Sequence, residues 1–288
     1  MGTAIKQEIS SEFLSNMEAI FQLIEGKSQA ISVVVLLILL VWESVSPFFA
    51  FFKASVKDRL RHGWRNILMG IINALMISSV FIALWLWAAE LAETYRIGLL
   101  YWLPVQGWVH AFCAVLLFDF WTYWWHRINH EIPFFWKIHR VHHSDAKMDV
   151  TTANRFHIGE IFFSSVFRII LILAFGAKLW HLAIYESLMF PIVQFHHANI
   201  GVTAWTDRIL RILIVTPAMH KVHHSRIMKE TNSNYTSFLS LWDRIFCTFR
   251  LRRKPHEIHF GLEELDDEKH QSLSGLIRTP LVKKDSSS

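Results

Sequence analysis

Residues 126–143 read HRINHEIPFFWKIHRVHH, and residues 220–224 read HKVHH. The two stretches contain three histidine boxes: HxxxH at 126–130, HxxHH at 139–143 and HxxHH at 220–224. Residues i and i+4 of a helix share a face, as do i and i+3, so each box can direct its imidazoles toward one point. The boxes contribute His126, His130, His139, His142, His143, His220, His223 and His224.

This number of histidines indicates a metal centre with more than one ion. Imidazole binds zinc, iron, copper and nickel. A single tetrahedral zinc takes only about four ligands, and the boxes supply twice that number. We therefore predict two metal ions side by side. Histidines outside the boxes, such as His62 and His270, are expected to be surface or interfacial side chains.

The composition is that of a membrane protein. The chain has 288 residues, of which 52% are hydrophobic and 13 are tryptophans, and an ordinary soluble domain is less apolar. The formal net charge is +5, and the basic residues cluster beside apolar segments, which fits an anionic membrane surface. A nucleic-acid-binding protein would carry such charge on a solvated face, so we expect no nucleic-acid partner.

Five apolar runs are candidates for membrane helices, because each approaches the roughly 20 residues needed to cross a bilayer. They cover approximately residues 30–52, 67–89, 109–125, 161–175 and 179–195. The predicted fold is therefore all-α: a multi-pass membrane protein with about four to five apolar helices and a cytosolic, histidine-rich helical cap that holds a dimetal site. Residues 203–254 fit an interfacial amphipathic helix and a core helix of the cap about equally well.

Basic residues between the first two runs determine the expected orientation. The positive-inside rule places this loop in the cytoplasm, because the next loop carries only Arg96 as a basic residue. All three boxes then fall on the cytoplasmic side, and the N-terminus lies across the membrane if the first run spans it fully. The basic residues of the first loop are Lys53, Lys57, Arg59, Arg61 and Arg65.

The three boxes, in this order, resemble the signature of the fatty acid hydroxylase and sterol desaturase superfamily of membrane-bound non-haem diiron oxygenases. The stretch 119–144 looks most like alkylglycerol monooxygenase and its bacterial relatives. Three further stretches resemble elements of the superfamily. The first is the T-x-x-R-x-H-P-x-E pattern, matched by Thr152, Arg155, His157 and Glu160, with Ile158 in place of proline. The second is H-x-N, which His196-His197-Ala198-Asn199 resembles, and the third is the closing segment, which Asn234-Tyr235 and Trp242-Asp243-Arg244 resemble.

This resemblance implies a set of site residues. The boxed histidines would be metal ligands, and one or two more ligands would come from His196, His197 or Asn199, among which the sequence does not decide. Asp119 precedes His126 by seven residues inside an apolar run, and we expect its carboxylate to accept a hydrogen bond from a box histidine. Catalytic roles are also predicted for two residues that would line the substrate mouth, Arg155 and His157.

The resemblance also implies the chemistry. Two iron ions would use dioxygen to hydroxylate, or alternatively desaturate, a fatty acyl, ether lipid or sterol-like substrate, and zinc can replace iron during purification. The chain lacks a dinucleotide-binding loop, a cysteine cluster for iron–sulfur and an HPGG haem-binding stretch. We therefore expect a separate electron donor, either a ferredoxin or a cytochrome b5-like protein.

Four segments are expected along the chain. They are a polar N-terminal segment at 1–29, N-terminal transmembrane helices at 30–106, a fatty acid hydroxylase-like catalytic domain at 107–254 and a polar C-terminal tail at 255–288. The first segment lacks the basic region and cleavage site of a signal peptide. Residues 271–288 are polar and rich in serine, and we expect them to be mostly disordered.

Two alternatives use histidines differently. A membrane metal transporter or metal-binding protein would line a path across the bilayer with them, whereas the boxes here lie at the ends of the apolar runs. A haem-binding electron carrier needs histidine pairs on facing helices, which the HxxHH doublets serve poorly. An O2-dependent lipid hydroxylase is therefore the leading hypothesis.

Overall fold

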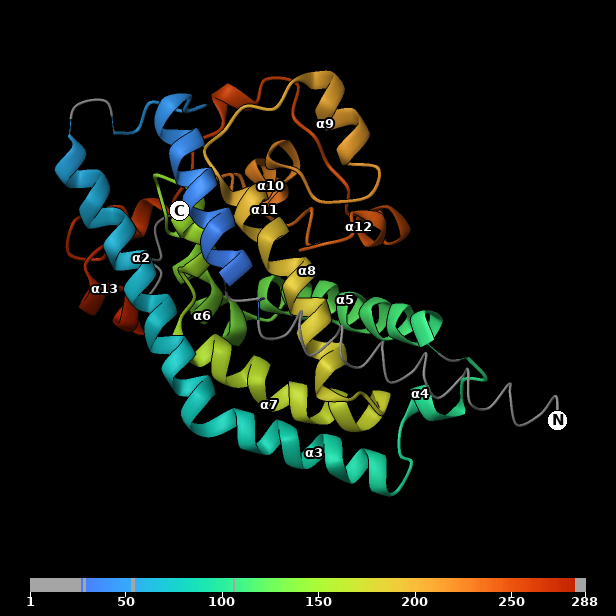
Figure 1. Cartoon of the computed structure of the whole chain (residues 1–288). Coiled ribbons are helices and arrows are strands. Elements are labelled where there is room, and N and C mark those ends of the chain that lie inside the picture. The colour runs from blue at the N-terminus through green and yellow to red at the C-terminus, as the bar shows by residue number, and fades with distance from the viewer. Residues whose placement is uncertain (1–26, 28–29, 53–54, 106, 283–288) are drawn as a thin grey trace, which may run out of the picture.

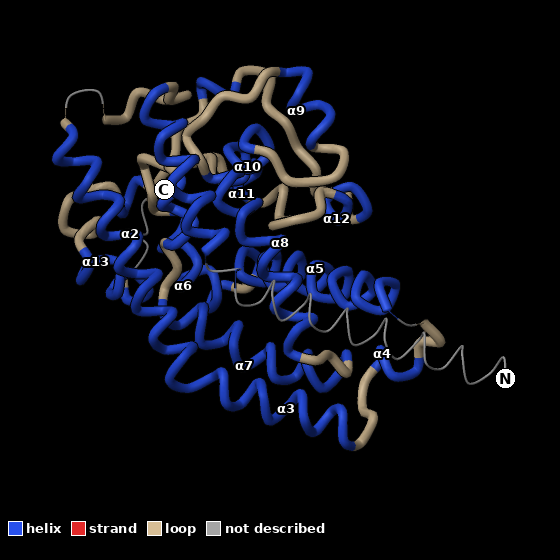
Figure 2. The backbone as a smooth tube through the Cα atoms, viewed as in Figure 1, coloured by secondary structure: helices blue, strands red, loops and turns tan. Residues whose placement is uncertain are grey.

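The computed structural model describes residues 27, 30–52, 55–105 and 107–282. These residues form helices, turns and loops without an extended β-strand, which confirms the all-α prediction (Figure 2). Most of the predicted N-terminal segment lies outside the described residues, as do residues 283–288.

The described chain begins with an apolar helix at Ala30–Val45. The longer elements that follow are α2 (Val56–Met76), the π-helical turn η1 (Ile77–Phe81), α3 (Ile82–Thr94), α4 (Leu99–Trp102), α5 (Gly107–Glu131), α6 (Pro133–His143), α7 (Ile158–Phe175) and α8 (Leu179–His197). Shorter helices are η2 (Val150–Asn154), α9 (Ala204–Leu210), α10 (Pro217–His223), α11 (Met228–Thr231), α12 (Leu241–Ile245) and α13 (Leu273–Arg278).

Helices α2 and α3 continue as one long bent helix, and α3 lies beside α7 (Figure 1). The bend falls at the π-helical turn between them, and such turns are a known cause of kinks. Here the hydroxyl of Ser79 also donates to the carbonyl oxygen of Leu75 at 2.6 Å. The kink lets the two halves pack against different partners, α2 on the histidine-rich cap and α3 on α7.

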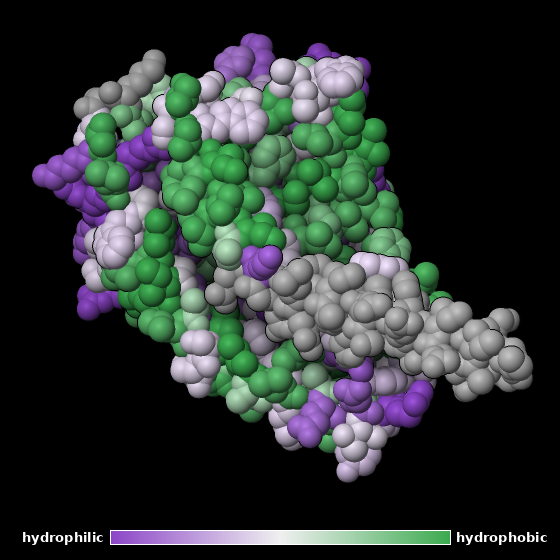
Figure 3. Space-filling model, viewed as in Figure 1, coloured by the Kyte–Doolittle hydropathy of each residue, from purple (hydrophilic) through white to green (hydrophobic). Residues whose placement is uncertain are grey.

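Within the described residues, two helical stretches are long and apolar enough to cross a membrane, Val56–Trp102 and Ile158–Phe175. The most apolar windows of the two have mean hydropathies of 2.4 and 2.1, and only 17% and 22% of these windows are buried inside the molecule. Their apolar side chains therefore face outward, and Figure 3 shows such side chains gathered over a broad face. The prediction of four to five spanning helices is not confirmed.

The apolar core lies between α3, α5, α7 and α8, next to the histidine-bearing ends of these helices. Each large side chain that is buried there stabilises the fold by about 1.5–3 kcal/mol. The core includes Phe81, Trp85, Phe118, Leu171, Ile172 and Leu182.

A buried carboxylate joins the first apolar helix to the cap. Glu43 accepts hydrogen bonds from the backbone N–H groups of Val150 and Asn199, both at 3.0 Å, and from the guanidinium of Arg59 at 3.1 Å. The side chain of Asn199 is bonded in both directions to the backbone of Phe49, at 2.8 Å each. These contacts hold the C-terminal end of α8 in place.

The prediction of disorder for 271–288 is wrong for residues 271–282, which are ordered against α6. Leu276 is fully buried in a cluster with Val141, and the guanidinium of Arg140 donates to the carbonyl oxygen of Thr279 at 2.6 Å. Polar composition alone misled the prediction, because one apolar anchor and a few hydrogen bonds from α6 are enough to order this short segment.

Candidate metal centre

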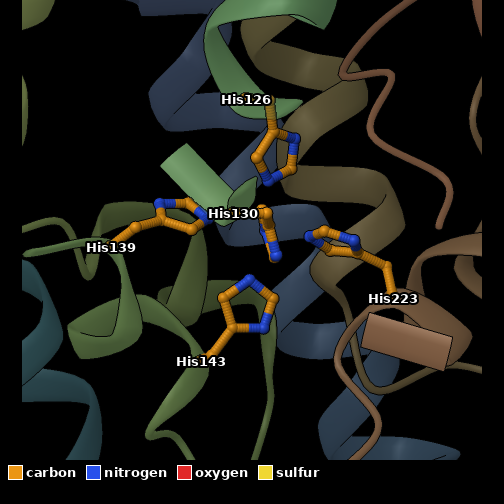
Figure 4. Close-up of side chains that lie close together, drawn as sticks. All are labelled: His126, His130, His139, His143 and His223. Atoms are coloured by element: carbon orange, nitrogen blue, oxygen red, sulfur yellow. The ribbon is translucent and has the colours of Figure 1, made fainter. Parts of the chain in front are cut away.

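Nine buried histidines form two adjoining groups. In the first group are His126, His130, His139, His143 and His223, and in the second are His142, His197, His220 and His224. Within each group the nearest ring nitrogens all lie within 4.8 Å of one another. Figure 4 shows the five rings of the first group directed toward a common centre.

The two HxxHH boxes divide between the groups in opposite ways. In the second box, His139 and His143 are four residues apart and belong to the first group, while His142 faces the second. In the third box, His220 and His224 belong to the second group, while His223 faces the first. Each HxxHH box therefore contributes to both groups, which corrects the expectation that all imidazoles of one box converge on one point; the two histidines of the first box do share one group.

Three rings of the first group are anchored through Nδ1. The Nδ1–H of His126 donates to the carbonyl oxygen of Tyr235 and that of His223 to the carbonyl oxygen of Ser233, both at 2.7 Å. His139 Nδ1 lies 2.9 Å from a carboxylate oxygen of Glu160. The opposite nitrogens, Nε2, are buried and have no hydrogen-bond partner among the described residues. An anchored Nδ1–H that leaves Nε2 as a bare donor is the arrangement that histidine metal ligands adopt.

In the second group the Nε2 atoms approach one another directly. His197 Nε2 lies 3.1 Å from His142 Nε2 and 2.9 Å from His220 Nε2, and His220 Nε2 lies 3.1 Å from His224 Nε2. Nitrogens that bind one metal at about 2.0–2.1 Å are separated from each other by about 2.8–3.4 Å. The donor set and its spacing thus fit a shared cation.

Burial lowers the pKa of eight of the nine grouped histidines, His126, His130, His142, His143, His197, His220, His223 and His224. Desolvation lowers the pKa of His223 to about 3. The pKa of His142 and that of His224 fall well below the ordinary value, first because of burial and then because of neighbouring histidines. A neutral imidazole presents a lone pair, so at neutral pH the rings are in the form that binds metal.

The structure separates the three candidates at the end of α8. His197 joins the second group, and its Nδ1–H donates to the carbonyl oxygen of Val193 at 2.7 Å. His196 is buried beside that group, with its ring centroid 3.9 Å from that of His220, but belongs to neither group. Asn199 is occupied by its backbone bonds to Phe49.

Asp119 is buried on α5, but its hydrogen bonds lead away from the histidines. The carboxylate accepts from the indole N–H of Trp242 at 2.8 Å, the backbone N–H of Leu239 at 3.2 Å and the hydroxyl of Tyr185 at 3.3 Å. The expected bond to a box histidine does not occur, because seven helical residues place Asp119 roughly 10 Å from His126 along the axis.

Asp119→Ala should therefore lower the stability of the fold rather than the metal content. Each buried donor that loses its acceptor costs about 1–3 kcal/mol, and Asp119 accepts from three donors. Thermal unfolding of the detergent-solubilised protein, together with metal analysis, measures both effects. If the variant loses metal while its melting temperature is unchanged, Asp119 supports the metal centre after all.

Arg155 and His157, which were expected at the substrate mouth, are not part of the lining of the cavity between α5, α7 and α8. Arg155 is 1% exposed, and its guanidinium donates to the carbonyl oxygen of Val141 at 3.0 Å and the hydroxyl of Ser144 at 2.9 Å, at the end of α6. The ring of His157 caps α7 through its Nδ1 and lies 3.0 Å from the carbonyl oxygen of Ile277 through Nε2. Both residues support the second box and the C-terminal segment.

Glu160 and a loop that follows the third box are the partners that the sequence interpretation missed. Glu160 appeared there only as a letter of the T-x-x-R-x-H-P-x-E pattern, although it is the carboxylate beside His139. The loop that carries the Ser233 and Tyr235 carbonyls is held by Asp243, which accepts from the backbone N–H of Tyr235 at 2.8 Å. Backbone acceptors of this kind leave no signal in a sequence.

A cavity of about 410 Å³ reaches the histidines from between α5, α7 and α8, a volume typical of small-molecule sites. Its histidine wall consists of His126, His139, His142, His196, His197 and His220. Its apolar wall includes Phe118, Trp121, Trp125, Leu171, Met189, Phe190 and Val193. An apolar chain can therefore lie against both histidine groups.

Comparison with known proteins agrees with this site. Residues 111–248 match the family model described as fatty acid hydroxylase. Alkylglycerol monooxygenase of Homo sapiens is 30% identical over 172 residues, which cover 59% of this chain and 36% of that protein. Ornithine lipid hydroxylase OlsE of Rhizobium tropici is 29% identical over 158 residues, 54% of this chain and 47% of that protein. Lathosterol oxidase of Mus musculus is 29% identical over 150 residues, 50% of this chain and 48% of that protein.

The chain spans less than half the length of these relatives. No solved structure matches it. The matched stretch nevertheless holds all three histidine boxes and most of the cavity wall. Residues 111–248 therefore belong to the fatty acid hydroxylase family.

Proposed function

We propose that this protein is a membrane-bound diiron oxygenase that uses dioxygen and external electrons to hydroxylate a C–H bond of a lipid. The observation that carries the proposal is the pair of adjoining histidine groups at the end of a largely apolar cavity. The names of the relatives support a lipid substrate and an oxidative reaction. Desaturation of a C–C bond is the alternative outcome of the same chemistry.

The ligands in this proposal are the nine grouped histidines, five for one ion and four for the other. Iron is the proposed metal, and zinc is the expected replacement, since imidazole accepts both. Two irons, when bound, would activate dioxygen, which together with two external electrons supplies the oxidant for an unactivated C–H bond. The protein residues anchor four of the ligands through Nδ1 and exclude water with an apolar wall.

The cavity wall would position the substrate. An extended apolar chain that lies along Trp121, Trp125 and Val193 brings a methylene group to the histidine end, where His126 and His197 face the cavity. Small shifts of the chain would decide between hydroxylation and desaturation, because reactivity depends on placement within fractions of an ångström. The proposed substrate is a fatty acyl lipid, an ether lipid or a sterol-like lipid.

Electrons would come from a separate protein, a ferredoxin or a cytochrome b5-like carrier. We propose that the protein crosses the membrane several times and that its histidine site faces the cytoplasm, because the basic residues near α2 favour that orientation. Exposed basic residues on the cap, such as Lys137, Arg253 and Lys254, would face the donor.

Two metal ions per chain are the first expected result. Protein purified in detergent after expression with added iron should contain about two ions, counted by elemental analysis. Absorption and Mössbauer spectra should then show coupled iron. One ion per chain at saturation would contradict the dimetal centre, and metal transport into vesicles without oxygen consumption would favour the transporter alternative.

A further inference from the structure

An ion pair lines the cavity away from the histidines. Arg168 of α7 forms a salt bridge with Glu186 of α8, and both residues belong to the cavity wall. The guanidinium also lies over the ring of Trp85, 4.9 Å from its centroid. Charged residues within an apolar helix are costly and usually functional, and α7 is one of the two stretches apolar enough to span a membrane.

The pair stands at a distance from the metal centre that suits a lipid. Glu160, which contacts His139, precedes Arg168 on α7 by eight residues, or about 12 Å along the helix axis. Between the two ends the cavity is lined by apolar side chains such as Trp121 and Met189. The cavity therefore has an oxidising end and a charged end, joined by an apolar section.

The side chains at the charged end are more exposed than those at the histidine end. The side chains of Arg168 and Glu186 are 21% and 41% exposed, whereas the histidines are buried. Neighbouring positions on the same helices carry exposed apolar side chains, Ile170 on α7 and Leu188 on α8. A polar group bound at the ion pair would therefore lie on helices whose other faces are apolar and exposed, as a lipid headgroup would when its chain enters from the bilayer.

We infer that Arg168 and Glu186 bind the zwitterionic headgroup of the lipid substrate, with the anionic group on Arg168 and the ammonium group on Glu186. The inference rests on the proposed function and specifies its substrate class. The pair has no net charge, so an anionic headgroup would leave Glu186 unpaired and a cationic one would leave Arg168 unpaired. An uncompensated charge in a poorly solvated site is strongly unfavourable, whereas a zwitterion replaces each partner with another of the same sign.

The test compares four single-chain lipids with the same hydrocarbon tail: lysophosphatidylethanolamine, a fatty acid, a fatty amine and a monoacylglycerol. Binding to the metal-loaded full chain is measured in detergent by quenching of tryptophan fluorescence with bromine-labelled tails, in the absence of oxygen and reductant. The wild type should bind the zwitterionic lipid most tightly. Arg168→Gln should weaken that binding by about tenfold to a hundredfold and shift the preference to the amine, while Glu186→Gln should shift it to the fatty acid.

A matched control pair lies on neighbouring segments but outside the cavity wall. Lys178 and Glu93 form a salt bridge at 2.6 Å, and Lys178→Gln and Glu93→Gln should leave the order of preference unchanged. If the single cavity variants fail to fold, the reversed pair R168E/E186R should fold and keep the zwitterion preference, because its net charge is still zero.

Three results would overturn the inference. The first is an unchanged order of lipid preference in both Arg168→Gln and Glu186→Gln. The others are a wild type that binds the monoacylglycerol most tightly and a reversed pair that binds a charged lipid most tightly. These outcomes are separable from failure of the proposed function. Binding is read without turnover, and a protein that holds two metals and binds lipids without the expected charge preference contradicts the headgroup assignment alone.

Discussion

Replacing His142 or His223 with alanine should abolish lipid oxidation, and each substitution should remove a different metal ion first. His142 belongs to the group of four histidines and His223 to the group of five. Loss of one ligand from the smaller group leaves three, so we expect His142→Ala to empty that site at metal concentrations that still fill the other. His223→Ala should weaken the larger group instead. Metal content per chain, measured together with product formation, separates the two effects.

The control for this experiment is His256→Ala, because His256 is an exposed histidine of the C-terminal segment. This variant should keep two metals and wild-type turnover. Membrane insertion and the elution volume in detergent should be the same for all three variants, and this measurement separates loss of metal from loss of the fold, because a buried side chain that is shortened leaves a cavity. Normal product formation by either box variant would remove that histidine from the ligand set.

The convergence of the boxed histidines could be predicted from the sequence, but their division between two groups could not. The i, i+3, i+4 spacing identifies histidines that share a helix face, and all eight boxed residues do reach the two groups. Which ring of a box serves which group depends on how α6 and α10 face each other. His142 and His223 therefore join opposite groups although each is the second histidine of its box.

Tertiary context also explains the errors at single residues. The sequence left His196, His197 and Asn199 open as candidates, and the structure places His197 in the four-histidine group, whereas Asn199 lies beyond the end of α8 and bonds Phe49. Arg155 was expected at the substrate, but it is buried behind α6, where it satisfies the Val141 carbonyl. Short-range patterns show which residues are unusual. They do not show which long-range partner each one meets.

The length of the apolar runs in the sequence predicted the membrane-spanning helices only in part. The windows within Val56–Trp102 and Ile158–Phe175 are apolar on most sides and largely unburied. Helices α5 and α8 are long enough, at 25 and 19 residues, but they mix apolar residues with buried polar ones that face the cavity. Hydropathy averages both faces of a helix, so it cannot separate a span that lines a polar site from a helix of the cap.

Glu160→Gln should lower the metal affinity of the five-histidine group by about 10–100-fold, the usual cost of losing a partner behind a ligand. Glu160 is 4% exposed and its Oε1 lies 2.9 Å from His139 Nδ1. Glutamine keeps the size of the side chain and an acceptor for the Nδ1–H. It lacks the negative charge that raises the basicity of the ring, so the bond from Nε2 to the metal should weaken.

The comparison with Asp119→Asn makes this test specific, because both substitutions neutralise a buried carboxylate near the centre. Competition with a chelator of known affinity should show weaker metal binding for Glu160→Gln and wild-type binding for Asp119→Asn, since Asp119 bonds Trp242 and Tyr185 rather than a histidine. The four-histidine group should keep its affinity in both variants, because Glu160 contacts only His139 among the grouped histidines in the described chain. Equal affinity losses in the two variants would indicate a general effect of buried charge, and an unchanged Glu160→Gln would show that the His139–Glu160 contact does not tune the metal.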